Sequence, residues 1–191
     1  MTDTDTDTTI DLTGVDPANQ GVDPARRTGD QKMLLQIYVN DHRAGAAGGL
    51  ALVRRSRDSN QGTSLGDTLR VIADEIEEDA ATLDRIAQHL GLRPNPVKQV
   101  AVQIAERIGR LKLNGRLRGY SPLSRVLELE GLLAGIDAKR KLWLALRTLV
   151  PDGEIAGIDL CALSERAESQ RERLISHHHE AAVEAFGGSP T

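Results

Sequence analysis

The feature that most constrains the fold is a helical spacing of apolar residues that begins near residue 31 and continues almost to the end of the chain. Apolar side chains recur at steps of three and four, which is the spacing of one face of an α-helix. Connectors that contain Gly and Pro separate these stretches. The sequence therefore predicts an all-α fold, an antiparallel four-helix-type bundle with one extra short helix. The predicted helices span residues 31–57, 65–90, 97–112, 122–149 and 159–186.

Composition agrees with closely packed helices. The 191 residues include one Trp, two Tyr and one Phe, whereas Ala, Leu, Arg and Glu are abundant. No apolar run reaches the roughly 18 residues that a membrane span needs, and the Thr/Asp-rich start lacks the pattern of a secretory signal. The lone cysteine, Cys161, excludes an intrachain disulfide and fits a reducing compartment. We therefore predict a cytoplasmic protein with no membrane association.

Negative charge is concentrated at the N-terminus. Residues 1–30 carry seven Asp and two Arg, a net of −5, so the remainder is near +1 because the whole chain is −4. Few large apolar residues are present there to offset the entropy of ordering. The repeated GVDPA (14–18 and 21–25) fits either a solvated arm or a duplicated docking peptide. We predict a disordered acidic tail over 1–30, a helical bundle domain over 31–187 and a flexible C-terminus over 188–191.

The helix predicted over 122–149 is apolar on two sides. Its second side carries Leu129, Leu132, Ile136 and Trp143. A helix with two apolar sides is either central in its own fold or also contacts a second subunit. We therefore predict a homo-oligomer, with a dimer as the simplest form.

Several charged or polar residues fall on helix faces that the apolar spacing assigns to the core. Burying such a group without a partner costs several kcal/mol, so we expect these side chains to find one another. Asp137 and Lys141 are spaced i, i+4 and can pair along the helix, and we place them with Gln170 in a buried polar network. The complete set is His42, Asp79, Glu130, Asp137, Lys141, Gln170 and His178.

Two interpretations of His42, Asp79, Glu130 and His178 remain open. One is a hydrogen-bonded network that fixes the register of the helices. The other is a metal site, because two imidazoles and two carboxylates suit one Fe, Mn or Zn ion. Both assume that the four side chains converge. The triplet His177–His179 cannot bind one ion as a unit, because consecutive helical residues point about 100° apart.

A basic segment, residues 107–125, contains six cationic side chains and no acidic one. It predicts either a solvated loop or a site for an anionic partner such as a phosphate, an acidic peptide or the chain's own tail. The near-neutral remainder and the scarcity of aromatic residues argue against nucleic acid as the partner. The cationic residues are Arg107, Arg110, Lys112, Arg116, Arg118 and Arg125.

Over about residues 31–187 the pattern resembles the ferritin-like superfamily. The resemblance rests on long helices in two hairpin-like pairs, a longer connection in the middle, and inward acids and histidines. Ferritin-like di-iron proteins carry a Glu on each of two helices and Glu-x-x-His on each of the other two. This sequence has no Glu-x-x-His, since Val39 precedes His42 and Ile86 precedes His89 at that spacing. The resemblance therefore implies a divergent branch without an ordinary di-iron centre.

No Gly-rich phosphate loop, Ser nucleophile elbow or Cys–His pair is present in the sequence. We therefore assign no catalytic residues and leave open whether the protein is an enzyme. The favoured function is a binding or scaffold module that uses no cofactor and binds a protein partner through the tail or the basic segment. The alternative is a divergent oxidoreductase that uses Fe, Mn or Zn in the cluster of inward histidines and carboxylates.

Overall fold

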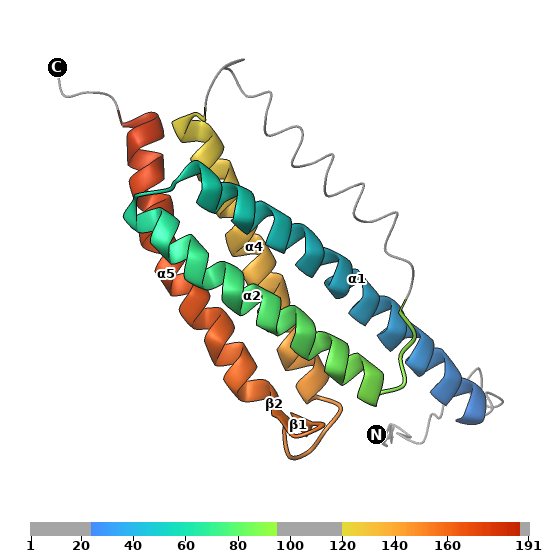
Figure 1. Cartoon of the computed structure of the whole chain (residues 1–191). Coiled ribbons are helices and arrows are strands. Elements are labelled where there is room, and N and C mark those ends of the chain that lie inside the picture. The colour runs from blue at the N-terminus through green and yellow to red at the C-terminus, as the bar shows by residue number, and fades with distance from the viewer. Residues whose placement is uncertain (1–23, 95–119, 188–191) are drawn as a thin grey trace, which may run out of the picture.

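The structure is a computed structural model that describes residues 24–94 and 120–187. Within these ranges four long helices lie side by side (Figure 1), so the all-α prediction is confirmed there. The helices are α1 (Pro24–Ser59), α2 (Ser64–His89), α4 (Pro122–Arg147) and α5 (Leu160–Phe186). The helix predicted over 97–112 and most of the basic segment lie outside the described residues.

Short polar side chains fix where three of the helices begin. Thr63, Ser121 and Asp159 precede α2, α4 and α5, and each accepts a hydrogen bond from backbone N–H groups of the first turn. These N–H groups have no partner inside the helix, so a side-chain oxygen at this position stabilises the helix start. Pro122 opens α4, where its missing N–H costs nothing. These starts lie within one residue of the predicted ones.

The first helix begins earlier than predicted. It starts at Pro24, seven residues before the expected start at residue 31. The predicted boundary of the tail at residue 30 therefore falls inside a helix. The spacing of apolar residues could not indicate these roughly two extra turns, because residues 24–30 contain almost no apolar side chains.

The four helices form two antiparallel pairs. A short turn joins α1 to α2, and a second connection joins α4 to α5. α1 packs mainly against α2 and α4, and α5 packs mainly against α4 and α2. Figure 1 shows that α2 ends and α4 begins at opposite ends of the assembly, so these two helices run in the same direction. None of the described helices combines the length and the apolar character that a membrane span requires.

A small hairpin joins α4 to α5 where the sequence predicts a plain connector. Its strands β1 (Glu154–Ile155) and β2 (Ile158–Asp159) pair antiparallel. The two residues between them, Ala156 and Gly157, have φ angles of 55° and 70°, as a type I′ turn requires. Ile155 is buried, so the hairpin closes this end of the helices.

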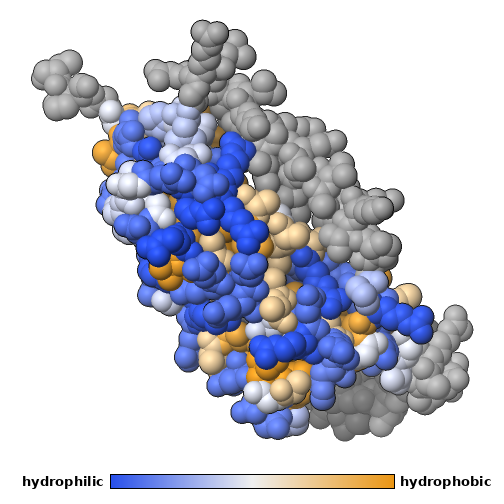
Figure 2. Space-filling view, viewed as in Figure 1, coloured by the Kyte–Doolittle hydropathy of each residue, from blue (hydrophilic) through white to orange (hydrophobic). Residues whose placement is uncertain are grey.

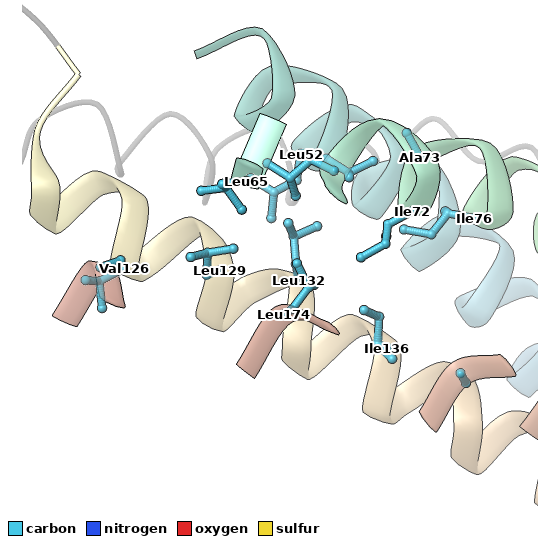
Figure 3. Close-up of a cluster of buried hydrophobic side chains, with 14 residues drawn as sticks. Leu52, Leu65, Ile72, Ala73, Ile76, Val126, Leu129, Leu132, Ile136 and Leu174 are labelled. Carbon is cyan, nitrogen blue, oxygen red and sulfur yellow. The ribbon is translucent and has the colours of Figure 1, made fainter. Parts of the chain in front are cut away.

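The core consists of two clusters of buried apolar side chains. Figure 3 shows the first, in which leucines and isoleucines of α1, α2, α4 and α5 meet. The second lies toward the hairpin and includes Val39, Ile86 and Trp143. Leu129, Leu132, Ile136 and Trp143, the second apolar side of α4, are buried within the chain itself. This side is therefore explained by the central position of α4, and it gives no support to a second subunit.

Candidate functional site

Asp79 of α2 is a buried carboxylate held by cations from two other helices. Its side chain is 2% exposed, and Lys139 Nζ of α4 lies 2.5 Å from Oδ2. The Arg166 guanidinium of α5 pairs with Oδ1. Burial lowers the pKa of Lys139 below its usual value, and the charge of Asp79 opposes that shift. Asp79 is therefore neutralised on both oxygens, as a buried charge requires.

Gln170 of α5 extends this cluster towards a second carboxylate. It is fully buried, and its Nε2 lies 3.0 Å from Glu75 Oε2 and 3.4 Å from Asp79 Oδ2. Its Oε1 accepts a hydrogen bond from Lys139. Arg173 Nη2 lies 2.5 Å from Glu75 Oε2. We call the set of Glu75, Asp79, Lys139, Arg166, Gln170 and Arg173 the Asp79 network.

A second buried carboxylate, Glu128 of α4, lies nearer the end at which α4 begins. Its side chain is 0% exposed, and Arg55 Nη2 lies 3.0 Å from Oε1. The Ser56 and Tyr120 hydroxyls donate to Oε2 at 2.6 and 2.9 Å. Burial raises the pKa of Tyr120, and the Glu128 charge raises it further, whereas a hydrogen bond from Asn60 lowers it.

The Glu128 cluster also fixes the turn after α1. Asn60 Nδ2 donates to the Tyr120 hydroxyl at 3.0 Å, and Asn60 Oδ1 accepts from Arg125 Nε at 3.0 Å. Arg125 lies over the Tyr120 ring, 5.6 Å from its centroid, and pairs with Glu184 of α5. Arg125 of the predicted anion patch is therefore held by contacts within the bundle. The other five residues of that patch lie outside the described ranges. The Glu128 network is Arg55, Ser56, Asn60, Tyr120, Arg125 and Glu128.

The four residues of the predicted metal cluster do not converge. Glu130 Oε1 and His178 Nε2 lie 3.4 Å apart at the surface between α4 and α5, whereas Asp79 lies in its own network. His42 stacks edge-to-face on Tyr38 with the ring centroids 4.7 Å apart, and burial lowers its pKa. Within the described residues no group of three or more His, Cys, Asp or Glu side chains could hold a metal ion. The prediction that these four side chains meet is therefore wrong.

The other residues of the predicted polar set lie in different surroundings. Gln170 lies in the Asp79 network. Asp137 Oδ1 lies 3.5 Å from Arg171 Nε of α5, and Lys141 is exposed. Asp137 therefore pairs with Arg171 of another helix and not with Lys141 of its own helix. The buried charged residues of α4 that the apolar spacing does not indicate are Glu128 and Lys139, which lie two residues before Glu130 and Lys141.

The described structure contains an apolar groove. It lies between α1, α2 and α4, is open on one side and encloses about 430 Å³. Its α1 and α4 walls include six small residues: Gly45, Ala46, Gly49, Gly131, Gly135 and Ala138. Apolar side chains such as Ile76, Leu83 and Leu132 add to the lining. Figure 2 shows hydrophilic residues over most of the visible face, broken by a band of apolar ones.

No protein-family model, no curated protein and no solved structure matches this chain. Function therefore has to be inferred from the chemistry of the site. Every carboxylate that is buried in the described residues already has cationic or hydroxyl partners, which leaves none of them free to act as a base or a ligand. The groove, by contrast, offers apolar surface and space.

Proposed function

We propose that this protein is a helical-bundle binding module that seats the apolar side of a helix in the groove between α1, α2 and α4. The observation that carries the proposal is the groove itself, about 430 Å³ and lined mainly by glycine, alanine and apolar side chains. Amphipathic helices bind proteins by laying their apolar face into a hydrophobic groove of this kind.

The dimensions of the groove suit a helix. On α4 it runs from Gly131 to Trp143, a separation of twelve steps, which is about 18 Å at 1.5 Å per residue. A Cβ atom added at Gly45, Gly49 or Gly135 would meet nothing within 4 Å. The missing side chains therefore leave hollows along both walls that the side chains of an approaching helix can fill.

The bundle is proposed to be of the ferritin-like type, without an ordinary di-iron centre. Support comes from the order of the helices, since two antiparallel pairs with α2 parallel to α4 fit the single long crossover of ferritin-like folds. The predicted homodimer, cytoplasmic location and partner sites on the tail or basic segment stay predictions.

The alternative function is a divergent oxidoreductase that depends on Fe, Mn or Zn. Its best support is the half-exposed pair of Glu130 and His178. One imidazole and one carboxylate are fewer ligands than a stable site for these metals needs, and no third ligand joins them among the described residues. The groove therefore supports the binding module better than this pair supports a metal enzyme.

Gly135→Glu tests whether the groove binds the apolar side of a helix. A bound helix would bury the new carboxylate, so we expect the substitution to weaken binding of an amphipathic helical peptide by about 1–3 kcal/mol, measured by calorimetric titration. The free protein should not be destabilised, because replacing a helical Gly gains roughly 0.5–1 kcal/mol.

Gly29→Glu is the matched control. Gly29 is also inside a helix, is exposed, and has nothing within 4 Å of an added Cβ. This substitution should leave binding of the peptide unchanged. Equal binding by both variants and by the unsubstituted protein would overturn the proposal.

A further inference from the structure

The two ends of the groove differ in chemistry because α1 and α4 run in opposite directions along it (Figure 1). The α1 lining extends from Tyr38 to Gly49, and the α4 lining extends from Gly131 to Trp143. A Cβ atom added at Gly131 would lie 3.1 Å from Leu52 of α1, so Gly131 lies at the same end as Gly49. Tyr38 and Trp143 therefore share the other end, which lies toward the hairpin.

The end away from the hairpin is lined by glycines and carries no charged side chain. Gly45 and Gly49 of α1 face this part of the groove together with Gly131 and Gly135 of α4. Added Cβ atoms at Gly45, Gly49 and Gly135 would meet nothing within 4 Å. This end therefore has room for bulky apolar side chains of a bound helix.

Three charged side chains line the rest of the groove, and two of them neutralise each other. Lys139 Nζ lies 2.5 Å from Asp79 Oδ2, within the Asp79 network. The third, Asp41, is exposed and forms no hydrogen bond or ion pair with any residue that the structure describes. The groove therefore presents one carboxylate that has no cationic partner among those residues.

His42, which also lines the groove, does not supply the missing positive charge. Burial lowers the pKa of its imidazole, and this effect exceeds the opposite effect of the Asp41 charge. Because the usual pKa of histidine is about 6.5, His42 is neutral near pH 7. The negative charge of Asp41 is therefore uncompensated at the hairpin end of the groove.

A helix that covers this end has to provide a partner for Asp41. An apolar side chain there would remove water from the carboxylate and leave it unpaired, which is costly. A lysine or arginine would pair with Asp41 at the exposed rim, and its methylene groups would cover apolar lining such as Tyr38. Charge complementarity therefore selects a cation at this position of the bound helix.

We infer that the partner is a basic amphipathic helix of another protein, with a lysine or arginine against Asp41 and bulky apolar residues against Gly45 and Gly49. This inference rests on the proposed function, because it names the kind of helix that the groove binds. Asp41 and Gly49 are about 12 Å apart along α1. The partner therefore carries its cation and its farthest apolar residue about seven or eight positions apart, on one face of its helix.

Two synthetic peptides test the inference on the full chain without any substitution in the protein. Each is a helical peptide of about 18 residues with leucines on one face, long enough to span about 27 Å. One carries a lysine at the end of that face, and the other carries a glutamate at the same position. We expect the lysine peptide to bind about tenfold more tightly, since the glutamate removes an attraction and adds a repulsion.

Fluorescence anisotropy of the labelled peptides measures both affinities, at low and at high salt. The preference for lysine should shrink as the salt concentration rises, because ions screen a pair of charges at an exposed rim. A difference in affinity that salt does not change would have a cause other than Asp41 and would overturn the inference.

Asp41→Lys should reverse the preference, so that the glutamate peptide binds more tightly. Asp30→Lys is the matched control, because Asp30 is an exposed residue of the same helix outside the groove and the change in net charge is identical. It should keep the preference for lysine. A reversal in both variants would show an effect of overall charge, and a reversal in neither would exclude Asp41; each result would overturn the inference.

The outcomes also separate this inference from the proposed function. Equal binding of the two peptides, weakened by Gly135→Glu, would overturn the basic partner and leave the groove as a binding site for a helix. Binding of neither peptide would overturn both. Self-association that excludes both peptides, measured by sedimentation, would identify a second copy as the occupant and overturn the inference.

Discussion

Glu128→Ala should destabilise the protein by about 3–5 kcal/mol, the range for removing one partner of a buried charge pair. The carboxylate is fully buried and holds Arg55, Ser56 and Tyr120. Without it, these partners keep their burial and lose their acceptor. Glu128→Gln retains an acceptor oxygen and should cost less. The free energy of unfolding from urea denaturation measures both effects.

Glu130→Ala is the matched control on the same helix. The Glu130 side chain is 54% exposed and contacts His178 at 3.4 Å, so its removal should change stability by less than about 1 kcal/mol. Equal losses for the Glu128 and Glu130 variants would contradict the central position of Glu128 in the buried network.

Asp79→Leu should cause a comparably large loss, about 3–5 kcal/mol, because it leaves Lys139 and Arg166 without their shared carboxylate. The double variant Asp79→Leu with Lys139→Leu should recover part of that loss, since it removes one stranded cation. A double-mutant cycle from urea denaturation gives the coupling energy, expected at about 1–3 kcal/mol.

Asp84→Ala provides the control for Asp79. Asp84 lies on the same helix and pairs with Arg43, but its side chain is 65% exposed, so we expect a loss of about 0–1 kcal/mol. A coupling energy near zero between Asp79 and Lys139 would mean that this pair does not act as a unit in the folded protein.

The helices could be predicted because their signals are local. Thr63, Ser121 and Asp159 indicate helix starts from their chemistry alone, and apolar spacing gives the buried face of α2 and α5. The hairpin was missed because two-residue strands carry no alternation of apolar and polar residues to detect. Its turn also places Ala156 at φ 55°, where Gly or Asn is the usual signal.

The buried charges of α4 could not be predicted, because this helix is apolar on two sides. The apolar spacing indicates Glu130 and Lys141 as core-facing, whereas the structure buries Glu128 and most of Lys139. Two residues along a helix correspond to about 200° of rotation, so each wrong choice points to the opposite side. Which side is buried depends on the neighbouring helices, and that information lies outside α4.

Elemental analysis of untagged protein, followed by a melt with and without a strong chelator, tests most directly whether this bundle is a binding module or a metal enzyme. A metal held only by the folded state would raise stability by linkage. We expect well below about one equivalent of Fe, Mn or Zn per chain and the same Tm in both melts. About one equivalent, lost together with stability in His178→Ala, would contradict the binding module and favour the oxidoreductase.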